Sequence, residues 1–111
     1  MHKALVAGLE AAGLSMLVAP QHRLPQLNTV RVPDGVDEAA VRARMLTKYD
    51  LEIGAGLGPL KGKVWRVGLM GASATPWHVR LCLMALTEAL AAQNYPDAQK
   101  AALAAAEAEL A

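Results

Sequence analysis

The sequence has few aromatic residues and a single cysteine. It contains no phenylalanine, and tryptophan and tyrosine together make up 4% of its 111 residues, whereas hydrophobic residues reach 54%. The core must therefore be aliphatic, built from leucine, valine, methionine and alanine. One cysteine, Cys82, excludes a disulfide within the chain. Because Cys82 lies among leucines, we expect a buried and unreactive thiol.

An excess of charge of either sign is also missing. The 11 basic and 10 acidic residues give a net charge of +1. Nucleic acids and anionic membranes attract proteins through a strong positive field, so neither is expected as a partner. His2, His22 and His78 are scattered, without carboxylate or thiol neighbours at ligand spacing, and no metal site is expected.

No long apolar run is present. Residues 1–13 are too often interrupted by polar residues to span a membrane, and they lack the small-residue cleavage site of a secretory signal. We therefore expect a reducing, cytoplasmic compartment.

Hydrophobic periodicity and capping residues predict helices in four places. Leucines at helical spacing predict a first helix that Gly13 ends. Asp37 is expected to cap a second helix, and Thr75 a third that starts at proline. Residues 97–111 predict a fourth helix of nearly pure alanine character. Its few large apolar side chains suggest that it packs weakly or docks on a surface outside this chain.

Four short apolar runs predict strands at residues 14–18, 27–32, 51–53 and 64–69. Combined with the helices, they favour an α/β (α+β) fold of two layers. We expect a small, mainly antiparallel sheet that helices cover on one face.

The segment LEIGAGLGPLKGKVWRVGLMG, residues 51–71, has a glycine-dense loop followed by an apolar strand with Arg66 at its centre. A guanidinium there must face solvent, pair with an acid, or bind a ligand carboxylate, because burial without a partner costs several kcal/mol. Gly54, Gly56 and Gly58 would let the main chain approach a ligand closely. Arg66 is therefore a candidate substrate-binding residue and the three glycines a possible active-site loop. The alternative is a structural arginine on an edge strand.

The glycine loop does not match the phosphate-binding motifs. A P-loop requires glycine where this chain has Leu57, and Val64 follows Lys63 where serine or threonine is needed. The GAGLG segment also lacks the final glycine spacing and the acidic ribose partner of a dinucleotide-binding fingerprint.

Two longer segments carry a family resemblance. HRLPQLNTVRVPDGVDEAAVR, residues 22–42, and YDLEIGAGLGPLKGKVWRVGLMGASATPWHV, residues 49–79, resemble the C-terminal small domain of the class V aminotransferases. The alanine:glyoxylate and serine:glyoxylate (serine:pyruvate) enzymes are the most similar. The resemblance implies the small-domain fold of fold-type I pyridoxal-phosphate enzymes over residues 1–93, with residues 94–111 as an alanine-rich helical extension.

The resemblance also implies a function. It implies pyridoxal 5'-phosphate as cofactor, a homodimer, and a large cofactor-binding domain of the same enzyme as partner. The substrates would be small amino acids and 2-oxo acids, with transfer from alanine or serine to glyoxylate or a similar acceptor. The family's arginine for the substrate α-carboxylate maps onto Arg66.

The family's Schiff-base lysine belongs to the large domain, and none of the five lysines here, Lys3, Lys48, Lys61, Lys63 and Lys100, corresponds to it. We therefore expect no catalytic residue and few or no cofactor ligands in this chain, which alone would be inactive. The alternative is an autonomous, non-catalytic module that binds a small carboxylate or a protein partner.

Overall fold

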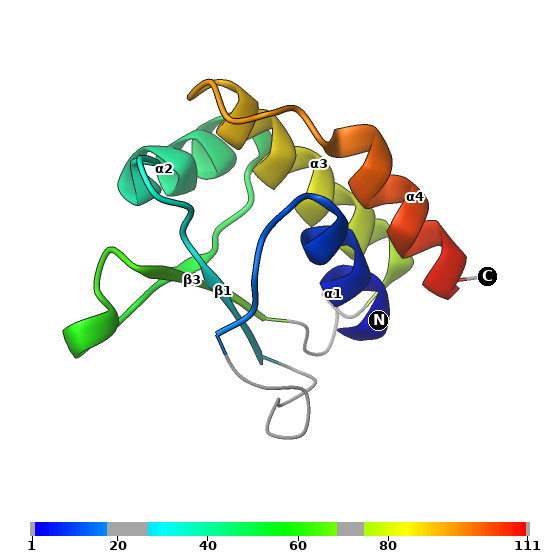
Figure 1. Ribbon diagram of the computed structural model, residues 1–111, viewed down its shortest axis with the longest axis horizontal. Coiled ribbons are helices and arrows are strands. Elements are labelled where there is room, and N and C mark those ends of the chain that lie inside the picture. The colour runs from blue at the N-terminus through cyan, green and yellow to red at the C-terminus, as the bar shows by residue number, and fades with distance from the viewer. Residues whose placement is uncertain (1, 18–26, 69–74, 111) are drawn as a thin grey trace.

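The computed structural model describes residues 2–17, 27–68 and 75–110 of the chain. The elements in these residues are, in order, α1 (His2–Ala11), β1 (Leu27–Arg31), α2 (Glu38–Tyr49), β2 (Gly54–Ala55), the 3-10 turn η2 (Gly58–Leu60), β3 (Val64–Gly68), α3 (Pro76–Ala91) and α4 (Gln99–Leu110). Figure 1 shows α1, α3 and α4 side by side and α2 next to α3.

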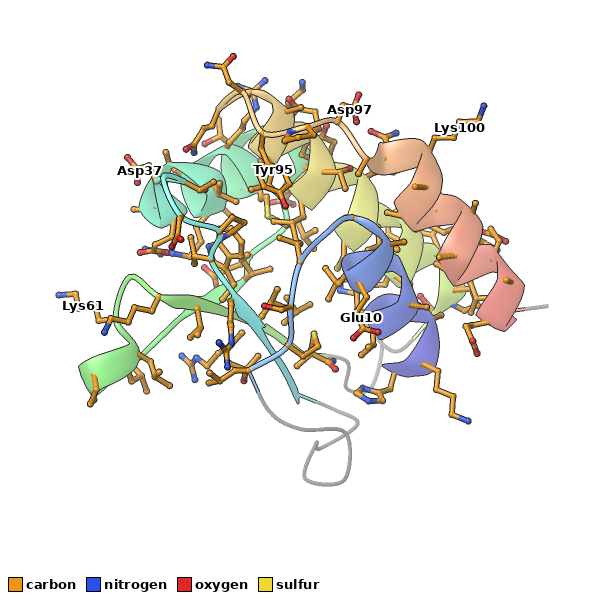
Figure 2. All side chains as sticks on the ribbon, in the orientation of Figure 1. Glu10, Asp37, Lys61, Tyr95, Asp97 and Lys100 are labelled. Atoms are coloured by element: carbon orange, nitrogen blue, oxygen red, sulfur yellow. The ribbon has the colours of Figure 1, made fainter. Side chains whose placement is uncertain are left out.

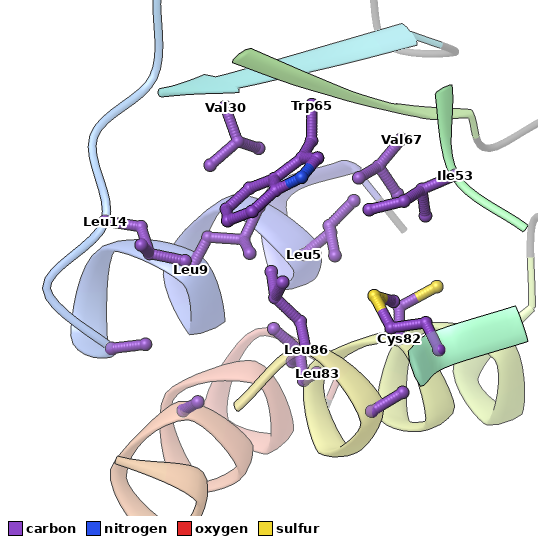
Figure 3. Close-up of a cluster of buried hydrophobic side chains, with 14 of the residues drawn as sticks. Leu5, Leu9, Leu14, Val30, Ile53, Trp65, Val67, Cys82, Leu83 and Leu86 are labelled. Atoms are coloured by element: carbon purple, nitrogen blue, oxygen red, sulfur yellow. The ribbon is translucent and has the colours of Figure 1, made fainter. Parts of the chain in front are cut away.

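The strands form an antiparallel sheet in the order β1-β3-β2, with β3 in the centre. Figure 3 shows the helices on one side of the strands, with core side chains between the two layers. The predicted fold class, a small antiparallel sheet covered on one face by helices, is confirmed.

Trp65 occupies the middle of the core. Its side chain is fully buried, and its indole nitrogen donates to the carbonyl oxygen of Glu38 at 3.4 Å. Around it, buried aliphatic side chains of the sheet meet those of α1 and α3, among them Val30, Val67, Leu5, Leu9 and Leu86 (Figure 3). The aliphatic core expected from the composition therefore surrounds one aromatic ring.

The predicted helix caps of α2 and α3 are confirmed. The Asp37 side chain accepts a hydrogen bond from the backbone nitrogen of Ala40 at 3.1 Å. The Thr75 side chain accepts from the nitrogen of His78 at the same distance. Each cap satisfies a donor that the first helical turn would otherwise leave unpaired.

Two of the predicted strands do not form as regular strands. Residues 14–17 pair with β1 at one antiparallel bridge, between Met16 and Val30, which two backbone hydrogen bonds flank: Leu17 donates to Thr29 at 3.0 Å and Arg31 to Ser15 at 2.9 Å. Residue 18 lies outside the described part. Residues 51–53 contribute the buried side chains of Leu51 and Ile53, but the strand β2 begins after them. Leu51 and Ile53 are buried by direct contact with the core, which needs no strand pairing.

The alanine-rich helix α4 was expected to pack weakly or to dock on a surface outside this chain. It packs instead within the chain, on α1 and α3. Ala102 and Ala106 are fully buried, whereas Leu103 is only partly so. Gly8 explains the close approach, because a Cβ atom there would lie 3.0 Å from the carbonyl oxygen of Ala102. Small residues on both helices replace the large apolar anchors on which the weak-packing prediction depended.

Cys82 is buried as predicted, with 4% of its surface exposed. Burial in apolar surroundings raises the pKa of its thiol to about 12. In the described part of the chain, no helix has the length and apolar character needed to cross a membrane.

Candidate functional site

Arg66 lies at the centre of β3, and its side chain is on the face of the sheet opposite to those of Trp65 and Val67. Its neighbours Trp65 and Val67 point into the core (Figure 3). Because side chains alternate along a strand, Arg66 projects to the other side. It is half-buried there, since strands pair with β3 on both sides.

The strand β2 holds the Arg66 side chain. Nε of Arg66 donates a hydrogen bond to the carbonyl oxygen of Ala55, with a nitrogen–oxygen distance of 2.7 Å. Gly54 is paired directly with Arg66 in the sheet. A Cβ atom at Gly54 would lie 3.3 Å from Cβ, Nε and Nη2 of Arg66. The arginine side chain therefore extends across the bare backbone of β2.

A cavity of about 540 Å³ opens beside Arg66. One wall comes from α2 and the other from the chain around β2 and the end of β3. Its lining residues are Ala39, Arg42, Ala43, Leu46, Glu52, Ile53, Gly54, Arg66 and Gly68.

The wall that α2 contributes is partly apolar and partly charged. Leu46 keeps 47% of its surface exposed. The guanidinium of Arg42 is held by both carboxylate oxygens of Glu38, at 2.7 and 3.1 Å. A guanidinium beside a small apolar surface suits a short carboxylate ligand, whose oxygens Arg66 could bind.

The three glycines of the predicted loop have different surroundings. Gly54 lies against Arg66, as described above. A Cβ atom at Gly56 would lie 2.2 Å from the carbonyl oxygen of Leu60, so Gly56 lets the turn close on itself. Gly58 has a φ of +56° and begins η2. The structure thus brings Gly54 to Arg66, whereas Gly56 and Gly58 shape the turn that follows.

The sequence did not reveal two parts of this site. The carbonyl of Ala55 is a backbone group, and no side-chain pattern marks it. Leu46 could have been noticed, because Ala39, Ala43 and Leu46 recur at helical spacing beside the buried face of α2.

The lysines of this chain lie on its surface. All five are exposed to solvent, and Figure 2 shows Lys61 and Lys100 projecting outward. Lys48 pairs with Glu88, its Nζ lying 3.3 Å from Oε1.

A metal centre was not expected from the sequence. Among residues 2–17, 27–68 and 75–110, the structure contains no group of three or more histidine, cysteine, aspartate or glutamate side chains that could hold an ion.

No family model matches the chain. It is nevertheless 45% identical over 89 residues to alanine–glyoxylate aminotransferase of Drosophila melanogaster, a match that covers 79% of this chain and 23% of the relative. Two solved structures share its fold. Ureidoglycine-glyoxylate aminotransferase of Bacillus subtilis has a TM-score of 0.90 and 35% identity, over 95% of this chain and 27% of the other. Pyridoxamine-pyruvate aminotransferase of Mesorhizobium loti has a TM-score of 0.92 and 36% identity, over 97% and 28%.

The chain thus spans about a quarter of the length of the proteins that it matches. Similarity in both sequence and fold extends over most of this chain. By these comparisons the chain belongs with the C-terminal small domains of the class V aminotransferases, a pyridoxal-phosphate-dependent family that includes the alanine–glyoxylate enzymes.

Proposed function

We propose that this chain is the C-terminal part of a pyridoxal-phosphate-dependent transaminase that moves an amino group from alanine or serine to glyoxylate or a similar 2-oxo acid. The observation that supports this best is Arg66, a half-buried guanidinium held by β2 beside a cavity of about 540 Å³. The similarity to alanine–glyoxylate and ureidoglycine–glyoxylate enzymes supports the substrate class.

In this proposal Arg66 binds the α-carboxylate of the amino donor and the carboxylate of the oxo-acid acceptor. A planar guanidinium can hold both carboxylate oxygens at once, which fixes the direction of the bound acid as well as its position. Donor and acceptor carry the same carboxylate, so one arginine serves both halves of the reaction. The residues around Arg66 exclude part of the solvent, which strengthens the ion pair.

The cofactor and the catalytic lysine belong to the rest of the protein in this proposal. Pyridoxal phosphate supplies the electron sink for amino transfer when it is bound. This chain alone would therefore be inactive, and its partner would be the large cofactor-binding domain of the same enzyme. We further propose a homodimer for the intact protein and a cytoplasmic location.

Replacement of Arg66 by alanine in the full-length protein tests the proposal. We expect KM for the amino donor to rise and kcat/KM to fall about 100-fold, because charge-assisted hydrogen bonds contribute roughly 1.5–3 kcal/mol. Cofactor absorbance should stay unchanged. Arg31→Ala is the matched control, because Arg31 is an exposed arginine of the neighbouring strand β1. Equal kinetics for the Arg66→Ala variant and the parent would remove Arg66 from the site.

A further inference from the structure

We propose that the backbone of β2 at Gly54 and Ala55 holds the Arg66 side chain in place before any substrate binds, and we call this backbone segment the seat. With Nε held by the seat, the two terminal nitrogens of Arg66 bind the substrate carboxylate. This inference rests on the proposed function of Arg66. It concerns Gly54 and Ala55, which act through Arg66 and do not themselves touch the substrate.

The single hydrogen on Nε of Arg66 decides how a carboxylate can bind. That hydrogen points to the carbonyl oxygen of Ala55 at 2.7 Å. A guanidinium offers a carboxylate either the Nε and Nη2 edge or the Nη1 and Nη2 end. Nε is already engaged, and the bond to Ala55 is the hydrogen bond that the Arg66 side chain makes within the described residues. A carboxylate at the Nη1 and Nη2 end would therefore leave that bond intact.

Gly54 supplies the space that this arrangement needs. It faces Arg66 across the sheet, and a Cβ atom there would lie 3.3 Å from three atoms of the arginine side chain. That is tighter than ordinary van der Waals contact, so a branched side chain at residue 54 would push the guanidinium away from Ala55. An arginine has several rotatable bonds, and fixing them beforehand reduces the entropy that binding must otherwise remove.

The seat also explains why lysine would be a poor replacement. A lysine ammonium could donate to the carbonyl of Ala55 or to a carboxylate. It lacks the planar guanidinium of arginine, whose Nε can donate to Ala55 while the two Nη atoms donate to the carboxylate in a fixed direction. Arg66→Lys in the full-length protein keeps the charge and should still lower kcat/KM about tenfold or more. A lysine variant with the parent's kcat and KM would show that charge alone matters, and the seat would be disproved.

The direct test is nuclear magnetic resonance of the 111-residue chain labelled with nitrogen-15 arginine. The Nε–H signal of Arg66 is identified by its loss in Arg66→Lys. We expect this hydrogen to exchange with water about tenfold more slowly than the Nε–H of exposed Arg31, because one hydrogen bond protects it. Gly54→Val should abolish this protection. Ala55→Val, whose added methyl groups point to the other face of β2, should retain it. Exchange of Arg66 as fast as that of Arg31 would overturn the seat.

Titration with sodium glyoxylate separates the two proposals. If the Nη signals of Arg66 shift while Nε–H stays protected, both the seat and the carboxylate role are supported. If Nε–H is protected and no Arg66 signal responds to glyoxylate, the seat stands and the assigned role of Arg66 loses its support. If glyoxylate binds and Nε–H loses its protection, the carboxylate has taken the Nε edge and the seat is wrong.

Discussion

Gly8 of α1 lies directly against Leu83 of α3. A Cβ atom at Gly8 would be 2.4 and 2.8 Å from the two terminal methyl carbons of Leu83. Leu83 is fully buried, so its methyl groups have little room to move aside. The absence of a side chain at Gly8 therefore lets α1 pack closely against α3, while α1 also contacts α4.

We therefore expect Gly8→Ala to lower the free energy of unfolding by about 1–3 kcal/mol through overpacking. Alanine is favoured over glycine in a helix by about 1 kcal/mol, so an uncrowded position would show the opposite sign. Urea unfolding of the 111-residue chain measures the difference. The control is the double variant Gly8→Ala with Leu83→Ala. Its loss of unfolding free energy should be smaller than the sum of the two single losses, because the shorter residue 83 makes room for the added methyl group.

Gly56 should tolerate a side chain less well than Gly54. The added Cβ of Gly56→Ala would stand 2.2 Å from a backbone oxygen of Leu60, whereas at Gly54 it would meet the Arg66 side chain at 3.3 Å. A backbone clash forces the turn to open, at an expected cost of about 2 kcal/mol or more. Thermal unfolding of both alanine variants tests this. If the melting temperature of Gly56→Ala equalled or exceeded that of Gly54→Ala, the contact between residue 56 and the backbone of Leu60 would not be as tight as the structure shows.

The sequence predicted those features whose causes lie within a few residues of each other. The caps at Asp37 and Thr75 depend on hydrogen bonds that reach three residues along the chain. The link from Arg66 to Ala55 could not be predicted, because it depends on how the intervening turn sets the strand register. Arg66 stands out in the sequence, whereas the backbone carbonyl that holds it is visible only in the fold.

The packing of α4 was missed for a related reason. Alanines at residues 102 and 106 give little hydrophobic signal by themselves, yet both are fully buried. The close approach of Ala102 to α1 depends on Gly8, which lies more than 90 residues earlier in the chain. A helix that looks featureless in sequence is therefore part of the core.

Cys82 should resist thiol reagents as long as the chain is folded. Burial raises the pKa of its thiol to about 12, so almost no thiolate is present near neutral pH. We expect negligible labelling by an aromatic disulfide reagent at about pH 8, and rapid labelling once urea unfolds the chain. The urea sample is the internal control for reagent activity. Fast reaction in native buffer would show that the α3 region opens readily.

Glu88 on α3 joins three side chains of α2. Its carboxylate accepts hydrogen bonds from Arg44, the shortest at 2.8 Å, and from the hydroxyl of Tyr49 at 3.2 Å. Lys48 lies 3.3 Å away. The hydrogen bonds from Arg44 are the main reason that the pKa of Glu88 falls from 4.5 to about 2. Protonation of this one carboxylate therefore weakens the attachment of α2 to α3.

The lowered pKa of Glu88 gives the sign of the pH dependence. Its contribution to stability is complete above the unfolded pKa of 4.5 and is lost as the pH falls toward about 2. We expect the melting temperature of the parent chain to fall over this range, and Glu88→Gln to flatten the fall by lowering stability at neutral pH. Glu107, paired with Arg80, has a lowered pKa as well and should account for part of the slope that remains. Glu109→Gln, at an exposed residue near the end of α4, is the matched control and should follow the parent curve. If the melting temperatures of the parent and of Glu88→Gln fell by the same amount over this pH range, Glu88 and its partners on α2 would contribute nothing to acid sensitivity.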